Sequence, residues 1–277
     1  MEALADLERF PIHVPGTGPY ADLVSRCRQE LKETGLLELE GFLSPAACAQ
    51  SVAEILPVME REGYMHSRSH NIYFEDSVPG LDSGHPALRK FVTANRTVCG
   101  DRIAESIPVR LYEYPPLRAF IAKVLGKDRL YLMEDRLARV NVMHYRSGEA
   151  LNWHFDRSEF TVTLLLQAPH SGGLFEYRTG LRNDHDPNYE GVAEFLSGPD
   201  SLTRRVRTSE GTLCVFKGKN TAHRVTPVEG DRGRMMAVFS YFETPGVRFS
   251  EEEQIGFYGR AGPPGSARRS VGQGDRA

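Results

Sequence analysis

Between residues 129 and 243 the sequence repeats short apolar segments that end at turn-forming residues. The segments are rich in β-branched and aromatic side chains, and Gly, Pro, Asn, Asp or Ser separates each one from the next. They read RLARVNVMHY, FTVTLLLQ, GGLFEYR, TLCVFKG, AHRVTPV and RMMAVFSYF. Strands that follow one another so closely favour two packed sheets or a jelly roll.

Helical signals dominate the part of the chain before these strands. Apolar residues recur at four-residue spacing over residues 20–34, and the pattern predicts a helix there. A second helix is predicted from Pro45, with Ser44 as its cap, and a third between Pro116 and Gly126. We expect these helices to pack outside the strands.

Two further segments and the end of the chain complete the predicted organisation. Residues 60–105 are polar and rich in turn formers, so we predict loops and short elements that cover a site. Residues 179–201 interrupt the strands, and a short helix is expected in their middle. We predict one domain over residues 1–258 and a disordered tail over residues 259–277, which has little to bury.

Composition and charge limit the partners of the protein. The 277 residues carry a formal net charge of −3, so no basic surface for nucleic acid or an anionic membrane is expected. The N-terminus MEALADLERFPIHVPG has acids where a signal peptide needs bases, and no later stretch approaches the length of a membrane span. Four scattered cysteines lack metal-site spacing. We expect a cytoplasmic protein that acts on a small molecule.

Two potential metal ligands stand two positions apart in the stretch NWHFDRSEF. Side chains in a strand alternate between its faces, so His154 and Asp156 point the same way. His223 lies in a later strand, AHRVTPV. Two imidazoles and one carboxylate leave open positions on an octahedral ion, as in non-haem Fe(II) oxygenases. The pair alone is weak, since a histidine in a strand is more often a surface or core residue.

An arginine opens one of the last predicted strands. Arg234 heads a face whose alternate members are Met236, Val238, Ser240 and Phe242. A guanidinium beside an apolar inward face needs an anionic partner, and a dicarboxylate cosubstrate would match its planar fork. Arg232 is also close to His223 in sequence and competes for this role.

Taken together, these residues resemble the Fe(II)/2-oxoglutarate-dependent oxygenases, in which HxD, a distal histidine and an arginine on the next strand lie in a double-stranded β-helix. VMHYRSGEALNWHFD and SGGLFEY are similar to the prolyl hydroxylase branch. The resemblance covers roughly residues 129–243. It implies a mainly β fold with flanking helices, whose jelly-roll, cupin-like core carries the N-terminal helices outside.

The same resemblance implies roles for five residues. His154, Asp156 and His223 would bind Fe(II), while Arg234 would pair with the distal carboxylate of 2-oxoglutarate. The register of the family, counted back from SYFE, selects this arginine. Tyr145 would donate its hydroxyl to the same carboxylate, and O2 would be the second cosubstrate.

Asn141 completes the candidate residues. By alternation it shares a strand face with Tyr145 and Met143, which makes it a candidate lining residue, and we group it with the cofactor-binding set. Its side chain could equally satisfy a neighbouring backbone group.

The local sequence around these motifs is similar to that of a narrower group, the HalD/BesD-type radical halogenases of free amino acids and their hydroxylating relatives. The similarity lies in NWHFDRSEFTVTLLLQ, GLFEYR and FKGKNTAHRVTPV. Those halogenases have Gly or Ala where this chain has Asp156, and the gap admits chloride to the iron. With the carboxylate present, the resemblance implies hydroxylation of an unactivated C–H bond, most simply in a free amino acid. A radical halogenase, a desaturase and a non-enzymatic metal-binding cupin-like protein remain alternatives.

Overall fold

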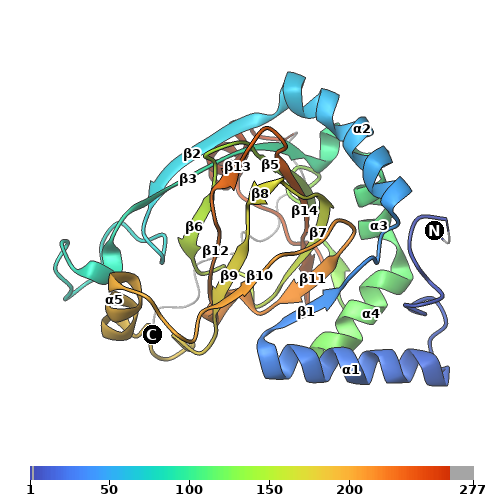
Figure 1. Ribbon diagram of the computed structural model, residues 1–277, viewed down its shortest axis with the longest axis horizontal. Coiled ribbons are helices and arrows are strands. Elements are labelled where there is room, and N and C mark those ends of the chain that lie inside the picture. Colours follow the sequence, from blue (N-terminus) through green and yellow to red (C-terminus); the bar gives the residue numbers. More distant parts are fainter. Residues whose placement is uncertain (2, 263–277) are drawn as a thin grey trace.

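The computed structural model describes residue 1 and residues 3–262, and its strands form two main antiparallel sheets (Figure 1). In the larger sheet the order is β1 (Leu36–Leu39), β11 (Leu213–Phe216), β7 (Thr161–Gln167), β14 (Arg234–Phe239), β5 (Val140–Tyr145), β3 (Phe91–Cys99) and β2 (Tyr64–His70). In the smaller sheet it is β10 (Arg204–Val206), β9 (Phe175–Arg178), β12 (Ala222–Val225) and β6 (Leu151–His154). Two short pairs join β13 (Val228–Glu229) to β8 (Ser171–Gly172) and β15 (Tyr241–Phe242) to β4 (Tyr131–Leu132).

Helices cover the outer face of the larger sheet, so the expected jelly-roll fold with external helices is confirmed. They are α1 (Gly18–Thr34), α2 (Pro45–Glu62), α3 (Ile107–Glu113) and α4 (Pro115–Leu125), which gather on one side of the strands in Figure 1. On the other side lies α5 (Tyr189–Ser197), which falls within the predicted insertion. Among the described residues, no helix combines the length and the apolarity that a membrane crossing requires.

The predicted helix ends depend on local chemistry that the structure reproduces. Gly35 ends α1 at φ 76°, and Gly126 ends α4 at φ 72°, a backbone region that favours glycine. Ser44 caps α2, because its hydroxyl accepts a hydrogen bond from the backbone N–H of Ala47 at 3.2 Å. The sequence predicts these helix ends because they depend only on neighbouring residues.

Alternation along β14 separates the core from the cavity. Met235, Ala237 and Phe239 are buried in the main hydrophobic core against the helices. Arg234, Met236 and Val238 face the other way and line the cavity between the sheets. The strand therefore serves packing with one face and the site with the other.

The prediction of loops over residues 60–105 is wrong for much of that segment. Strands β2 and β3 pair antiparallel from Tyr64↔Thr97 to His70↔Phe91, and β3 continues onto β5. Because β2 is largely exposed on one face and polar on the face toward the cavity, its sequence lacks the apolar alternation that identifies a strand. Two helices, α3 and α6 (Glu251–Tyr258), were also not predicted.

The start of the predicted tail is anchored, contrary to expectation. Arg260 donates to both carboxylate oxygens of Asp101, at 2.7 and 2.9 Å, and the backbone N–H of Gly262 donates to Gln254 at 2.8 Å. These contacts fix residues 259–262 beside α6. The remainder of the expected disordered tail, residues 263–277, lies outside the described residues.

Candidate active site

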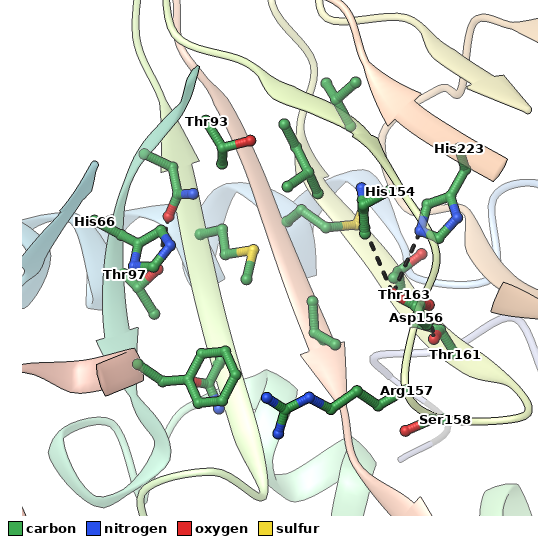
Figure 2. Close-up of a pocket in the computed structure, with 18 of the residues that line it drawn as sticks. His66, Thr93, Thr97, His154, Asp156, Arg157, Ser158, Thr161, Thr163 and His223 are labelled. Atoms are coloured by element: carbon green, nitrogen blue, oxygen red, sulfur yellow. Dashed lines mark hydrogen bonds and ion pairs between the residues drawn. The ribbon is translucent and has the colours of Figure 1, made fainter. Parts of the chain in front are cut away.

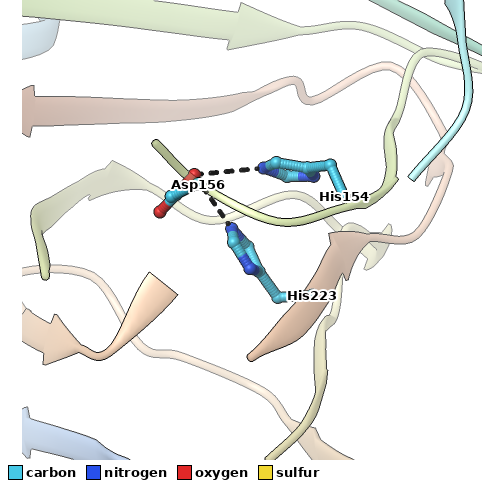
Figure 3. A group of neighbouring side chains, drawn as sticks. All are labelled: His154, Asp156 and His223. Atoms are coloured by element: carbon cyan, nitrogen blue, oxygen red, sulfur yellow. Dashed lines mark ion pairs between the residues drawn. The ribbon is translucent and has the colours of Figure 1, made fainter. Parts of the chain in front are cut away.

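Three potential metal ligands meet at one end of the smaller sheet (Figure 3). His154 ends β6 and His223 lies on β12, directly opposite it in the antiparallel pairing. Asp156 follows β6, and its Oδ1 lies 3.5 Å from Nε2 of each imidazole. One ligand atom from each residue falls within 4.8 Å of the others. The structure thus brings together the three residues that the sequence pattern selected.

Backbone carbonyls fix both imidazole rings. Nδ1 of His154 donates to the carbonyl of Asn152 at 2.8 Å, and Nδ1 of His223 donates to the carbonyl of Thr221 at 2.9 Å. Such a bond on one ring nitrogen sets the tautomer and leaves the other as a lone-pair donor. Both Nε2 atoms are therefore suited to hold a metal ion.

The carboxylate is oriented by its own neighbours. The Thr161 hydroxyl donates to Oδ2 of Asp156 at 2.5 Å, while Oδ1 faces the imidazoles. The backbone N–H of Asp156 donates to the carbonyl of Gly218 at 3.1 Å. A Cβ at Gly218 would fall 2.0 Å from Oδ2, so only glycine leaves room for the carboxylate here.

Electrostatics give the cluster the protonation states that a metal site needs. Burial lowers the pKa of His154, so its imidazole is neutral at pH 7. Burial by itself would raise the pKa of Asp156, but the neighbouring His223 and His154 outweigh it and hold that pKa well below its usual value. A neutral imidazole and an ionised carboxylate form the donor set of a divalent transition metal, so the residues fit iron.

A cavity of about 340 Å³ opens beside the cluster (Figure 2). Both main sheets contribute to its walls, together with the turn after β2 and helix α6. His154, Asp156 and His223 lie on one side of it, while His66, Thr93 and Thr97 lie on the wall formed by β2 and β3. A small molecule in this cavity would contact the three ligand residues directly.

Arg234 reaches the cavity from β14 with a charge that no described carboxylate neutralises. Its side chain is 3% exposed, and its guanidinium carbon lies 6.0 Å from the ring centroid of Tyr145, its partner in the strand pairing. A buried guanidinium without an anion is costly, which indicates a site for an anionic ligand. Arg232, the competing candidate, is instead exposed and pairs with Glu210 at 2.7 Å.

Tyr145 and Asn141 both line the cavity, but their polar atoms differ in availability. The Tyr145 hydroxyl has only the weak acceptor Sδ of Met143, at 3.3 Å, and burial raises its pKa to about 12, so it stays a donor. The Asn141 amide donates to the carbonyls of Leu137 and Ala138, at 3.2 and 3.0 Å. The sequence left open that Asn141 satisfies neighbouring backbone groups, and its amide nitrogen does so. A role of Asn141 in cofactor binding stays a prediction.

Several cavity residues were missed by sequence reasoning because they come from β2, β3 and the turn between them. The set includes His66, Arg68, His70, Phe74, Thr93, Asn95 and Thr97. The six polar members share one signal, a polar residue at every second position of each strand, whereas Phe74 lies between the two strands and lacks that signal.

The family described as HalD, halogenase D, matches residues 20–252, which is most of the chain. This protein belongs to the halogenase D family. The match spans helices α2 to α5, both sheets and all three potential iron ligands, and it confirms the resemblance drawn from the strand motifs. A comparison with curated protein sequences finds no significant match.

Solved structures share the fold at low sequence identity. A 2OG-Fe(II) oxygenase family member from Burkholderia pseudomallei is 14% identical with a TM-score of 0.50, and the alignment covers 80% of this chain and 92% of that chain. AviO1 from Streptomyces viridochromogenes Tue57 is 17% identical with a TM-score of 0.54, covering 80% and 95%. The epimerase SnoN, in complex with Fe3+, alpha ketoglutarate and nogalamycin RO, is 15% identical with a TM-score of 0.53, covering 80% and 84%. At such identities the likeness shows the fold.

Family membership, fold and the His–Asp–His cluster agree on the enzyme class. This member of the halogenase D family is a 2-oxoglutarate-dependent dioxygenase, with iron and 2-oxoglutarate as its cofactors. The cofactor expectation from sequence is thereby confirmed at the level of the class. The reading as a non-enzymatic cupin-like protein is accordingly set aside.

Proposed function

We propose that this enzyme hydroxylates an unactivated C–H bond of a small substrate, most simply a free amino acid. The observation that carries the proposal is the position of Asp156, whose Oδ1 lies 3.5 Å from both imidazole nitrogens. Sequence resemblance assigns Gly or Ala to this position in the radical halogenases. A side chain without ligand atoms there would leave room for a halide, and a carboxylate fills that room.

In this proposal His154, Asp156 and His223 hold the ferrous ion. The backbone carbonyls of Asn152 and Thr221 orient the two imidazoles, and Thr161 orients the carboxylate. These three residues would leave such an ion open to molecules in the cavity. Bound there, iron would supply, with 2-oxoglutarate and O2 as cosubstrates, the oxidising power for C–H hydroxylation, and succinate and CO2 would be the coproducts.

Arg234 and Tyr145 are assigned to 2-oxoglutarate. The guanidinium fork matches a carboxylate with two parallel hydrogen bonds, and the Tyr145 hydroxyl adds a donor from the adjacent strand. Their burial excludes water from that end of the cavity, which strengthens both interactions. The two residues thus orient the cosubstrate, while the cavity walls hold the reactive carbon of the substrate.

A screen of free amino acids tests the proposal. Purified enzyme is incubated with Fe(II), O2 and 2-oxoglutarate, succinate release is measured for each candidate, and products are analysed for the gain of one oxygen atom. We expect at least one amino acid to stimulate succinate release and to gain oxygen. If no amino acid does either, while the enzyme still binds iron and 2-oxoglutarate, the amino acid assignment is wrong.

Radical halogenation is the second candidate, and the description of the family favours it. The same incubations with chloride separate the two outcomes, because halogenation replaces hydrogen by chlorine. We expect no chlorinated product from this enzyme. A chlorinated product would show that Asp156 does not occupy an iron position during turnover.

A further inference from the structure

We propose that the substrate is an anion of the acidic amino acid class, and that Arg68 and Arg157 select it at the mouth of the cavity. This inference rests on the proposed function and deepens it, because it names the charge of the molecule that the iron site acts on. It goes beyond the reaction class and concerns residues that neither the metal site nor the 2-oxoglutarate site uses.

The charges around the cavity are strongly unbalanced. Its described lining residues include three arginines, Arg68, Arg157 and Arg234, whereas the single carboxylate among them is Asp156. A ferrous ion beside Asp156 and a dicarboxylate beside Arg234 would neutralise one another. Of the two remaining arginines, Arg157 has Glu253 of α6 as a carboxylate partner outside the lining, and Arg68 has none among the described residues, so a positive charge would still face the substrate and a cationic substrate side chain is disfavoured.

Arg68 is the less neutralised of these two arginines. It is exposed on β2, lines the cavity, and forms no ion pair or hydrogen bond with a described residue. Its guanidinium carbon lies 5.4 Å from the ring centroid of Phe74, and the Phe74 ring in turn lies 5.7 Å from that of His154. Phe74 therefore stands between Arg68 and the metal site, and stacking orients the guanidinium over it.

The backbone at Phe74 supports a functional role for this arrangement. Its φ of 58° is in the left-handed region, which is unfavourable for a bulky side chain. The side-chain carbonyl of Asn71 accepts from the N–H groups of Tyr73 and Glu75, at 3.1 and 3.2 Å, and so closes the turn. The Tyr73 hydroxyl anchors the turn to the carbonyl of Pro187 at 2.8 Å. The surrounding contacts thus hold the Phe74 ring in place despite the strain.

Arg157 approaches the cavity from the segment after β6. In Figure 2 its side chain extends from the side of Asp156 toward the wall that carries Thr97. It donates to Glu253 at 2.9 Å and lies 5.6 Å from the ring centroid of Phe257, both on α6. Glu253 also accepts from the backbone N–H of Ser250 at 2.9 Å, so its negative charge is shared. Arg157 retains donors for a carboxylate at the mouth.

A neutral polar residue of the cavity wall also favours an anion. Asn95 is buried on β3 and lines the cavity, and its side-chain oxygen accepts from the Thr97 hydroxyl at 2.8 Å. The amide nitrogen is the polar atom left for a ligand, and it is a donor. Arg68, Asn95 and Arg157 therefore offer hydrogen-bond donors from two walls, which suits a substrate with two carboxylates.

Calorimetry under anaerobic conditions tests this inference on the full-length enzyme loaded with Fe(II) and 2-oxoglutarate. Glutamate is compared with glutamine and lysine, and aspartate with asparagine, so that charge changes with little change in size. We expect an acidic amino acid to bind at least about tenfold more tightly than its amide, a difference of about 1.4 kcal/mol, and lysine to bind more weakly than either.

Two variants assign the preference to the arginines. Arg68→Gln and Arg157→Gln should each weaken binding of the acidic amino acid about tenfold and change binding of its amide less than about twofold. Arg232→Gln, which alters an exposed arginine outside the cavity, is the matched control and should change neither. Melting temperatures of all variants establish that they fold.

Three results would overturn the inference: lysine binding as tightly as glutamate, neither acidic amino acid binding, or equal losses for acid and amide in the two variants. Succinate release separates this failure from failure of the proposed function. Hydroxylation of a basic or neutral amino acid instead of an acidic one would support the proposed function but refute the proposed selection of acidic substrates. Absence of iron and 2-oxoglutarate binding would instead refute the proposed function.

Discussion

The two walls of the cavity carry different kinds of site. On the smaller sheet, His154, Asp156 and His223 converge on one point, and each is fixed by a short hydrogen bond to backbone or hydroxyl. On the wall of β2 and β3, Arg68 and Asn95 spread over several positions, and Arg68 is exposed at the mouth. The side chains on the smaller sheet can surround a single metal ion, whereas those on the wall of β2 and β3 can contact several parts of a larger molecule.

This difference separates the residues proposed to support the reaction from those proposed to select the substrate. A metal ion requires all its ligands at once, so loss of one ligand should abolish the reaction. Contacts to an extended substrate are shared among several side chains, so loss of one should change affinity and preference gradually.

Asp156→Ala should have the largest effect. It removes the one carboxylate ligand and leaves the Thr161 hydroxyl without its acceptor. We expect hydroxylation to fall by more than about 100-fold, since loss of a partner outside the ligand set alone costs about 10–100-fold. Product formation by mass spectrometry measures it, with Asp231→Ala, an exposed residue paired to His170, as the control. Normal turnover in Asp156→Ala would refute the metal assignment.

Arg234→Lys tests the cosubstrate end of the cavity. Lysine keeps the positive charge but loses the planar fork, so we expect the KM for 2-oxoglutarate to rise about 10-fold or more. The KM for the amino acid substrate should change little, because Arg234 lies on a different strand from the proposed selectors. Arg232→Lys is the matched control. An unchanged KM for 2-oxoglutarate would place the cosubstrate elsewhere.

Thr161→Val removes the hydroxyl that orients Asp156 while preserving the shape of the side chain. We expect iron affinity to fall about 10-fold, at the lower end of the range for such partners. Titration with Fe(II) under anaerobic conditions measures this directly. If the affinity is unchanged, the contact with Oδ2 does not contribute to metal binding.

Phe74→Gly and Phe74→Ala form a matched pair on the opposite wall. Both remove the ring that separates Arg68 from His154, so both should raise the substrate KM by a similar factor of about 10. Only glycine relieves the positive φ, and we expect it to be about 1 kcal/mol more stable than the alanine variant. Denaturant unfolding gives the stability difference; equal stability would mean that the turn is not strained.

Glu253→Gln should have the smallest effect. Its ion pair with Arg157 is largely exposed on the arginine side, and such pairs contribute less than about 1 kcal/mol. Glutamine preserves the reciprocal cap with Ser250, so the loss of stability should be slight. Freed from its partner, Arg157 should bind an acidic amino acid up to about threefold more tightly. Weaker binding would assign the selecting role to the ion pair itself.

The predictable part of the molecule is the part set by regular spacing and close neighbours. Helices ending at Gly35 and Gly126 and the strand motif around His154 were read correctly, because their signals lie within a few residues. For strands β2 and β3 the sequence wrongly predicts loops, because the face that these strands turn toward the cavity is polar. Arg68 is not predicted as a site residue for the same reason, and Phe74 is not predicted because it lies between the two strands, where no period applies.

The sequence by itself determined which side chains can form the metal cluster and which strand face carries Arg234, since alternation with period two needs no distant partner. The family resemblance already selected Arg234 over Arg232, and the structure agrees, because Arg234 lines the cavity and Arg232 pairs with Glu210. Tertiary structure alone decided that Arg68, Asn95 and Arg157 line the same cavity from separate elements. The physical reason is that burial and charge balance depend on residues far apart in the chain. Only the folded protein brings them within reach of one another.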